Sequence, residues 1–518
     1  MIERMSLPIG TPKPWWRVHS AAVIVTVVLA LSYTYFGQGA GPNQNSRFDL
    51  VRAIVEEHRL SIDSFAANTI DKAQMGDHFY CDKAPGLSLA AVPFYALYRF
   101  VAGAPANTTS FVNALYWITW LTVGLATAFT GGLLTTLGPR FGASRVSSAT
   151  AALVWGLGTP AFAYATLFVA HQWVAFLLVV SFTLLTIPEP KRPSTLFVSA
   201  GFAAGFATIS EFPIAIAATI LGLFAARKHG LRAMLLFGAG GAPPIGLLGF
   251  YNARCFGSPF TLGYSRLATP EFQKVISRGF FGIALPTKTA LYGVLFSEFR
   301  GLLPLSPFLV LAPIGFWLAW KVRERRLELG VIAALSLSLL LLVSSYLRWD
   351  GGASMGPRYF LPALPFVTLT IAFCFDRVVS LRSPWHMVST PLAAILCLAS
   401  IFLCTAAVSV MPEFPDWFAP LRLGDQPIPR PEAPLRDFVL PWFFMGRLSA
   451  KASWPSGGLG LDHYESGHTW DAWNVGERMG LGGLASLLPL VLVWCAGVAA
   501  LAWAQKQEPP RDRQMDAP

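Results

Sequence analysis

The run VSTPLAAILCLASIFLCTAAVSV (residues 388–410) contains no charged side chain. A helix that crosses the hydrocarbon core of a bilayer needs about 20 mostly apolar residues, so this run predicts a membrane-spanning helix. The whole chain of 518 residues is 54% hydrophobic and 13% charged, with a mean hydropathy of +0.51. A soluble domain has about 25% charged residues. The composition therefore predicts a polytopic membrane protein and argues against a soluble enzyme or a disordered chain.

Similar apolar runs occur along most of the sequence and predict about twelve spans. They lie at 18–37, 108–136, 146–164, 170–187, 195–210, 212–226, 233–252, 302–320, 329–346, 359–375, 388–410 and 482–504. Glu211-Phe212-Pro213 interrupts the apolar stretch between the fifth and sixth of these. The predicted fold is all-α, with amphipathic juxtamembrane helices in the first outer loop.

The charge distribution predicts the orientation of these spans, because Lys and Arg gather in short cytoplasmic loops. With both termini in the cytoplasm, the inner segments hold 19 of the 39 basic and 8 of the 28 acidic residues. The whole net charge of +11 then lies on the cytoplasmic side. This asymmetry explains the basic composition without a nucleic-acid partner. We expect a multi-pass membrane protein with both termini in the cytoplasm and its site on the outer side.

Three outer segments are long, at 38–107, 253–301 and 411–481. We divide the chain into a transmembrane core at 1–410 that includes the first two, an outer region at 411–481, and a last span with a cytoplasmic tail at 482–518. The third segment is rich in tryptophan, which suits either an aromatic belt at the membrane interface or stacking on sugars. Its tryptophans are Trp417, Trp442, Trp454, Trp470 and Trp473. Cys81 and Cys255 fall on the outer side, where pairing is an open alternative.

The first outer loop begins with a predicted amphipathic helix at 46–60, which should lie along the membrane surface. Its apolar arc is Phe48, Leu50, Val51, Ile54 and Val55, and its polar face is Asp49, Arg52, Glu56 and Arg59. Ser46 and Asp49 match a capping box, in which both side chains satisfy free amides at a helix start. From the sequence, Asp49 is equally compatible with a capping role and with a catalytic role.

Two Asp-Lys pairs follow, Asp71-Lys72 and Asp82-Lys83, with His78 and Tyr80 between them. They suit either a solvated surface or anion binding, because lysine is a compact donor for phosphate. A second amphipathic stretch at about 86–102 leads toward the next span. Arg358 lies at the outer end of a span, where it would either hold a phosphate or reach toward the interface. Glu211 and His171 are ionisable groups at or near membrane depth, and such groups are candidate functional residues.

These motifs, taken in order, resemble the bacterial lipid-carrier-dependent glycosyltransferases of the GT-C superfamily, which include protein mannosyltransferases and lipid A aminoarabinose transferases. The resemblance covers nearly the whole chain. It rests on the surface helix followed by Tyr80-x-Asp82-Lys83-x-Pro85, on Tyr251-Asn252 with Phe256-Gly257-Ser258-Pro259, on Arg300-Gly301-Leu302-Leu303 with Ser306-Pro307, and on Gly356-Pro357-Arg358-Tyr359 with Leu361-Pro362.

The resemblance implies a polyprenyl-phosphate sugar donor, a glycan, lipid or protein acceptor, and inverting transfer on the outer face. It assigns the donor phosphate to Arg47, Lys83 and Tyr80, and Lys72 and Arg358 are further candidates. The aminoarabinose branch has adjacent acids where this chain has Gln44 and Asn45. We therefore take Asp49 as the general base, followed by Asp71, Asp82, His78 and Glu211 as alternatives, while His171 is a further candidate for substrate binding.

Cofactors stay open at this level. The sequence has no nucleotide-binding motif and no spacing that predicts a metal site, and a divalent cation remains an alternative. A transporter or flippase of lipid-linked sugars is the competing class, and an outer-face glycan ligase or polymerase is a third. Transporters commonly carry internal repeats with interrupted helices, whereas this sequence has one interruption, at Glu211-Phe212-Pro213, and no matching half.

The predicted orientation is open to a direct test in intact cells. A cysteine placed at Ser456 should react with a membrane-impermeant thiol reagent, and one placed at Gln505 should not. The opposite labelling pattern would reverse the orientation and move the predicted site to the cytoplasmic face.

Overall fold

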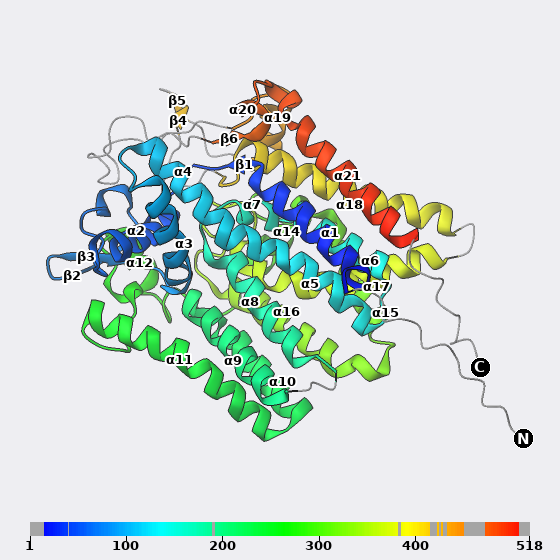
Figure 1. Ribbon diagram of the computed structural model, residues 1–518, viewed down its shortest axis with the longest axis horizontal. Helices are drawn as coiled ribbons and strands as arrows, with labels where there is room; N and C mark the ends of the chain where they lie inside the picture. The colour runs from blue at the N-terminus through cyan, green and yellow to red at the C-terminus, as the bar shows by residue number, and fades with distance from the viewer. Residues whose placement is uncertain are drawn as a thin grey trace, which may run out of the picture.

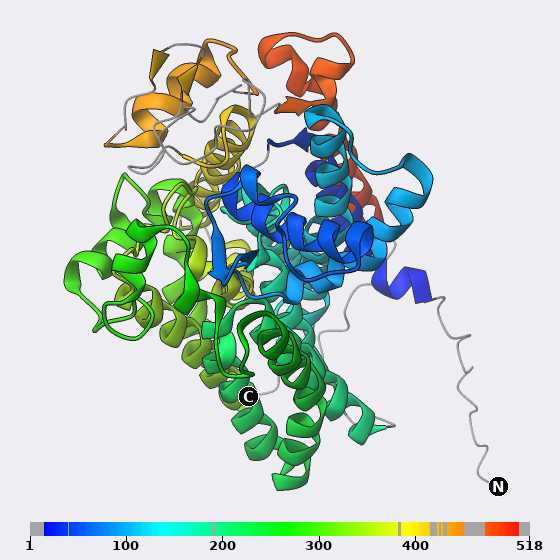
Figure 2. The same ribbon diagram turned by 90° about the vertical axis from the view of Figure 1, so that its left-hand side faces the viewer.

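A computed structural model of the chain describes residues 15–39, 41–188, 192–381, 385–414, 422–423, 426–427, 432–449 and 472–506. Within these ranges the protein is almost entirely helical, and its strands are three short antiparallel pairs. Long helices run roughly side by side through the body of the molecule, while the first outer loop gathers at one end (Figure 1). Figure 2 looks onto that loop. The predicted all-α architecture is confirmed.

The chain forms its elements in the following order. The helices are α1 (Trp15–Thr34), α2 (Pro42–Glu57), α3 (Gly86–Ala102), α4 (Thr108–Thr119), α5 (Leu125–Phe141), α6 (Arg145–Gly158), α7 (Ala161–Ala165), α8 (Ala170–Leu185), α9 (Pro193–Ser210), α10 (Ala215–His229), α11 (Leu231–Phe256), α12 (Pro270–Ile276), α13 (Lys288–Phe296), α14 (Leu302–Leu305), α15 (Ala312–Ala319), α16 (Arg326–Ser345), α17 (Leu364–Ser380), α18 (Trp385–Val410), α19 (Leu440–Phe444), α20 (Val475–Arg478) and α21 (Leu488–Lys506). The strands are β1 (Phe36–Gly37), β2 (Lys72–Met75), β3 (His78–Cys81), β4 (Arg422–Leu423), β5 (Gln426–Pro427) and β6 (Trp473–Asn474), paired β1–β6, β2–β3 and β4–β5.

Seven helices of the described chain are long and apolar enough to cross a membrane. They lie at Thr109–Phe141, Pro193–Ser210, Leu231–Phe256, Arg323–Ser345, Arg358–Ser380, Trp385–Val410 and Gly483–Lys506. Shorter apolar helices lie at His19–Thr34, Gly86–Ala102, Ala170–Leu185 and Pro307–Ala319. Each of the twelve predicted spans falls on a helical segment, although several of these segments are shorter than a full span.

The interruption predicted at Glu211 is confirmed. Helix α9 ends at Ser210, Glu211 adopts an extended backbone conformation (φ −151°, ψ 107°), and a 3₁₀ turn at Phe212–Ile214 precedes α10. A proline lacks the amide hydrogen that a continuous helix would need at this position. The break places the Glu211 side chain at the end of the bundle, beside the first outer loop.

Helix α2 begins one turn earlier than predicted. Gly41 is its N-cap and Pro42 occupies the first turn, where the fixed φ of proline suits a helix start. Ser46 and Asp49 therefore lie inside the helix, and the predicted capping box is wrong. Ser46 Oγ instead donates to Asp82 Oδ1 (3.3 Å), and Asp49 Oδ1 accepts from Asn68 Nδ2 (2.9 Å).

Most of the predicted polar face of α2 is covered, since the side chains of Arg52 and Glu56 are 11% and 12% exposed, while Arg59, at 39%, lies beyond the end of the helix. Asp49 is completely buried, because α2 packs against β3 and against the 3₁₀ turn at Ala66–Asn68. The hairpin that covers this face, β2–β3, turns through Gly76, which has a φ of +61°. The sequence analysis did not predict this hairpin, since its strands are short and carry mixed polar residues.

Two glycines allow distant segments to meet at this end of the bundle. A Cβ atom on Gly86, at the start of α3, would lie 2.8 Å from the backbone nitrogen of Ser210. A Cβ on Gly263, in the second outer loop, would lie 3.0 Å from the carbonyl oxygen of Asp82. These close approaches bring the Asp82-Lys83 turn against both the α9 break and the second outer loop.

The third outer segment is described in part. Trp417, Trp454 and Trp470 lie outside the described residues. Trp473 lies on β6 with the Arg478 guanidinium 3.4 Å from its ring centroid, and Trp442 packs on Phe438. The described contacts are between protein residues and leave the choice between an interfacial belt and sugar stacking open.

Close packing of α9 on α11 generates a stability prediction. A Cβ on Gly201 would overlap the carbonyl oxygen of Phe237, whereas a Cβ on Gly238 would meet no atom within 4 Å. We expect Gly201→Ala to destabilise the protein by about 1–3 kcal/mol through overpacking. Gly238→Ala, the matched control, should be neutral or slightly stabilising, since alanine favours helix. Equal unfolding midpoints for the two variants in detergent would contradict this packing.

Candidate functional site

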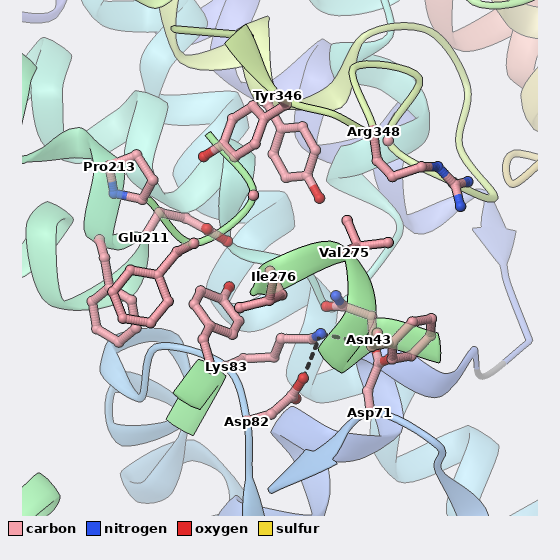
Figure 3. Close-up of a pocket in the computed structure, with 18 of the residues that line it drawn as sticks. Asn43, Asp71, Asp82, Lys83, Glu211, Pro213, Val275, Ile276, Tyr346 and Arg348 are labelled. Carbon is pink, nitrogen blue, oxygen red and sulfur yellow. Dashed lines mark hydrogen bonds and ion pairs between the residues drawn. The ribbon is translucent and has the colours of Figure 1, made fainter. Parts of the chain in front are cut away.

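A cavity of about 620 Å³ lies where the first outer loop, the α9 break and the second outer loop meet the ends of the long helices (Figure 3). Most of its lining side chains are apolar, and its polar ones come from several segments that meet around the cavity. The polar and charged lining residues are Asn43, Asp71, Asp82, Lys83, Glu211, Tyr264, Tyr346, Arg348, Arg358, Tyr359 and Glu413. A concave, largely apolar site with convergent polar groups is typical of small-molecule binding.

Lys83 lies between two carboxylates, and Figure 3 shows its side chain directed toward both of them. Its Nζ is 3.0 Å from Asp71 Oδ2 and 2.9 Å from Asp82 Oδ2. Burial disfavours the charged ammonium, but attraction to Asp71 and Asp82 outweighs burial and raises the pKa of Lys83 above its usual value. The ammonium is therefore charged, and with three donors it can bind a further anion from the cavity. The two Asp-Lys pairs of the sequence thus become one lysine held by two aspartates.

Lys72, the other lysine of these pairs, points elsewhere. Its Nζ donates to the carbonyl oxygen of Ala66 (2.7 Å) and lies 4.7 Å from the ring centroid of Phe79. Lys72 does not line the cavity.

Arg47 is almost completely buried and connects three segments of the site. Its guanidinium donates to Glu211 Oε1 (2.8 Å), to the carbonyl oxygen of Ala84 (3.1 Å) and to Asn43 Oδ1 (3.2 Å). These partners belong to α2, to the turn after β3 and to the α9 break. Arg47 does not line the cavity; it holds the residues that do.

Arg358 also lines the cavity, although it lies far along the chain from Asp71, Asp82 and Lys83. Its Nη2 donates to the hydroxyl oxygen of Tyr359 (3.1 Å), and within the described ranges it forms no ion pair with a carboxylate. Gly351, with a φ of +73°, lies against it; a Cβ there would sit 3.2 Å from Arg358 Cγ. The guanidinium is thus positioned by neutral neighbours and can receive an anion.

Glu413 also lines the cavity, just beyond the end of α18. Burial raises the pKa of the Glu413 carboxyl to about 8, although attraction to Arg358 opposes this shift. A carboxyl with this pKa is largely protonated at neutral pH, so it leaves the charge of Arg358 mostly uncompensated.

Several residues singled out from the sequence lie away from the cavity. Asp49 is enclosed by α2 and the Ala66–Asn68 turn, and burial raises the pKa of its carboxyl well above the usual range despite the hydrogen bond from Asn68. Tyr80 packs edge-on against Phe256 (5.6 Å between centroids). His78 is exposed at the hairpin, with its Nδ1 2.8 Å from Asp63 Oδ2.

His171, at the start of α8, lies behind the cavity wall. Its Nδ1 is 3.9 Å from Glu211 Oε1, and its ring packs against Tyr164 and Tyr359. Of the residues predicted from the sequence, the structure therefore brings Asp71, Asp82, Lys83, Glu211 and Arg358 together around one cavity, with Arg47 and His171 directly behind them.

The sequence analysis missed six polar residues of this cavity. Tyr346, Arg348 and Tyr359 flank the glycine-rich segment before Arg358, and Glu413 follows the end of a span, so these four carried a weak signal. Asn43 and Tyr264 had none, because neither lies in a motif. In the described part of the chain, no group of three or more His, Cys, Asp or Glu side chains is arranged to hold a metal ion.

No protein-family model and no curated protein sequence matches this chain. Solved structures of other proteins are similar to it in part, with TM-scores below 0.5. One is the archaeal oligosaccharyltransferase AglB from Archaeoglobus fulgidus in complex with an inhibitory peptide and a dolichol-phosphate, with a TM-score of 0.47 and 11% identity over 77% of this chain. This chain spans 57% of that longer chain.

Another is ArnT from Cupriavidus metallidurans bound to undecaprenyl phosphate, with a TM-score of 0.47 and 15% identity over 95% of this chain and 77% of that chain. For ArnT from Cupriavidus metallidurans in the apo state, the TM-score is 0.46 and the identity is 13%. That match covers 94% of this chain and 74% of the ArnT chain. At these identities and TM-scores the likeness concerns the arrangement of the helices alone.

The Arg47–Glu211 pair generates a second stability prediction. Replacing one partner of a buried ion pair leaves the other charge uncompensated, so Arg47→Met should destabilise the protein by about 3 kcal/mol. The double variant Arg47→Met/Glu211→Gln should recover part of this loss. Arg436 forms a pair with Glu298 at the surface, where both side chains are about two-thirds exposed, and Arg436→Met is the matched control with no measurable change expected. Equal effects of Arg47→Met and Arg436→Met on denaturant unfolding would contradict the role given to Arg47.

Proposed function

We propose that this protein is a glycosyltransferase that moves a sugar from a polyprenyl-phosphate donor to an acceptor hydroxyl on a glycan, lipid or protein. The observation that carries the proposal is the cavity itself. Its walls are largely apolar, and they carry two cations: Lys83, which contacts Asp71 and Asp82, and Arg358, which forms no ion pair with a carboxylate in the described ranges. A lipid phosphate linked to a sugar has matching parts: an apolar chain, an anion and a polar group that reacts.

The apolar wall suits the prenyl chain. Phe212 and Ile216 come from the α9–α10 region and Leu342 from α16, while Val275 and Ile276 come from α12. Ile216, which lines the cavity, is 43% exposed. A prenyl chain lying along this wall would stay within apolar surroundings while its phosphate reaches Lys83 and Arg358.

We assign the donor phosphate to Lys83 and Arg358. Charged hydrogen-bond donors directed at the oxygen that carries the departing charge stabilise it in the transition state. Arg47, which the sequence resemblance placed on the phosphate, serves in this proposal to hold Glu211, and Lys72 and Tyr80 act outside the cavity.

We assign the general base to Asp71. It lines the cavity, and Lys83 contacts its Oδ2, whereas its Oδ1 accepts no hydrogen bond from the described residues. Asp82 is more deeply buried and both of its oxygens have partners, Ser46 and Lys83. Asp49, the first choice from the sequence, has no access to the cavity.

In this mechanism Asp71 accepts the proton of the acceptor hydroxyl. The acceptor oxygen forms a bond to the anomeric carbon, and the bond from that carbon to the phosphate oxygen breaks. The electron pair of the broken bond stays on the phosphate, so polyprenyl phosphate leaves as an anion held by Lys83 and Arg358. A single displacement of this kind inverts the anomeric configuration. We place the site on the outer face of the cytoplasmic membrane, with twelve spans and both termini in the cytoplasm.

Removal of the base tests this proposal. Asp71→Asn should lower turnover by about 10²–10⁴-fold and leave donor binding close to wild type. Lys83→Ala should weaken donor binding by about ten- to a hundredfold, as the loss of a charged hydrogen bond does. The assay is release of polyprenyl phosphate from the lipid-linked sugar that co-purifies with the protein.

Asp77→Asn, on the exposed tip of the same hairpin, is the control and should retain wild-type turnover. Full turnover in Asp71→Asn together with its loss in Asp49→Asn would return the base to Asp49. Unchanged donor affinity in Lys83→Ala would show that the lysine only neutralises the two aspartates.

A further inference from the structure

One wall of the cavity combines an anionic carboxylate with three phenols. Glu211, Tyr264, Tyr346 and Tyr359 all line the cavity, although they come from the α9 break, the second outer loop, the end of α16 and the start of α17. Figure 3 shows Glu211 and Tyr346 on the side of the cavity away from Asp71 and Asp82.

Glu211 is held as a fixed hydrogen-bond acceptor. Arg47 occupies its Oε1 at 2.8 Å, while its Oε2 receives no hydrogen bond from the described residues and its side chain is partly open to the cavity. An ionised carboxylate can accept hydrogen bonds and cannot donate them. It therefore repels a phosphate and attracts hydroxyl groups.

The three tyrosines line the cavity together with this carboxylate, and their rings pack against aromatic neighbours. Tyr346 and Tyr359 lie 5.0 Å apart between ring centroids at 31°, and Tyr264 packs edge-on against Phe212 at 5.7 Å. The Tyr359 oxygen accepts from Arg358 Nη2, so its own hydrogen remains for another acceptor. Burial raises the pKa of the Tyr264 hydroxyl, and the nearby Glu211 raises it further, so this group is a neutral donor and acceptor.

We propose that this wall, Glu211 with Tyr264, Tyr346 and Tyr359, binds the hydroxyl groups of the transferred sugar and restricts the donor to sugars without a negative charge. The inference rests on the proposed function, since it divides the same cavity between two parts of the donor. Lys83 and Arg358 take the phosphate, and the wall around Glu211 takes the sugar. A sugar that carries a carboxylate would meet the fixed charge of Glu211 and be rejected.

The test compares two ligands that differ in the sugar. The probes are a short-chain polyprenyl phosphate and the same lipid phosphate carrying a neutral hexose, each measured by equilibrium binding to the purified full-length protein. Glu211→Gln and Tyr346→Phe should each weaken binding of the hexosyl lipid, Glu211→Gln by about ten- to a hundredfold, and leave affinity for the bare lipid phosphate unchanged. Lys83→Ala should weaken binding of both probes. A third probe is the lipid phosphate carrying a uronic acid, and the wild-type protein should bind it more weakly than the hexosyl lipid. In Glu211→Gln, the difference in affinity between these two lipids should be smaller than in wild type.

The outcomes separate the inference from the proposed function. Equal losses for the bare and hexosyl lipids in both Glu211→Gln and Tyr346→Phe would overturn the sugar site and leave the phosphate site standing. Unchanged hexosyl affinity in both variants would overturn it as well. If wild-type protein bound neither lipid, the proposed function itself would fail. Retained binding of the bare lipid shows that Glu211→Gln is folded, and Tyr346→Phe supplies an independent variant that leaves the Arg47 pair intact.

Discussion

The arrangement of the cavity depends on a buried guanidinium. Arg47 is 2% exposed and contacts Glu211, Ala84 and Asn43 at once, and each contact fixes a segment that contributes a side chain to the cavity. Transfer of an ion pair from water into a protein costs several kcal/mol unless its hydrogen bonds are satisfied. Here the backbone carbonyl and the amide oxygen satisfy the guanidinium together with the carboxylate. The pair thus specifies which segments meet, and its contribution to net stability is secondary.

The same constraint explains why an acid and an interrupted helix occur together. A continuous helix through residue 211 would carry its side chain away from the first outer loop. The proline two residues later prevents that, and Gly86 allows the turn after Lys83 to approach the freed backbone of Ser210. Two contacts therefore position the charged residues of the cavity. Arg47 holds Glu211, and the close approach at Gly86 holds the turn that carries Lys83.

The sequence predicted the parts of this site that lie in short motifs. Asp82, Lys83 and Arg358 follow from local spacing, and Glu211 follows from its depth in an apolar stretch. Asn43 and Tyr264 could not be predicted, because their position depends on contacts between segments far apart in the chain. The capping box at Ser46 failed for a local reason: Pro42 favours an earlier helix start, which moves Asp49 to a buried position. The short β2–β3 hairpin then covers that position, and no pattern in the sequence indicated it.

The neutral residues at 44 and 45 have a structural role at the start of α2. Gln44 Nε2 donates to the carbonyl oxygen of Gly39 while its Oε1 accepts from the backbone amide of Phe168, and Asn45 Nδ2 donates to the carbonyl oxygen of Asn68. Both amides act as donors, which an ionised acid at either position would be unable to do. These side chains fasten the start of α2 to its surroundings. The helix start is committed to this packing, and the two carboxylates beside Lys83, Asp71 and Asp82, come instead from the two ends of the β2–β3 hairpin.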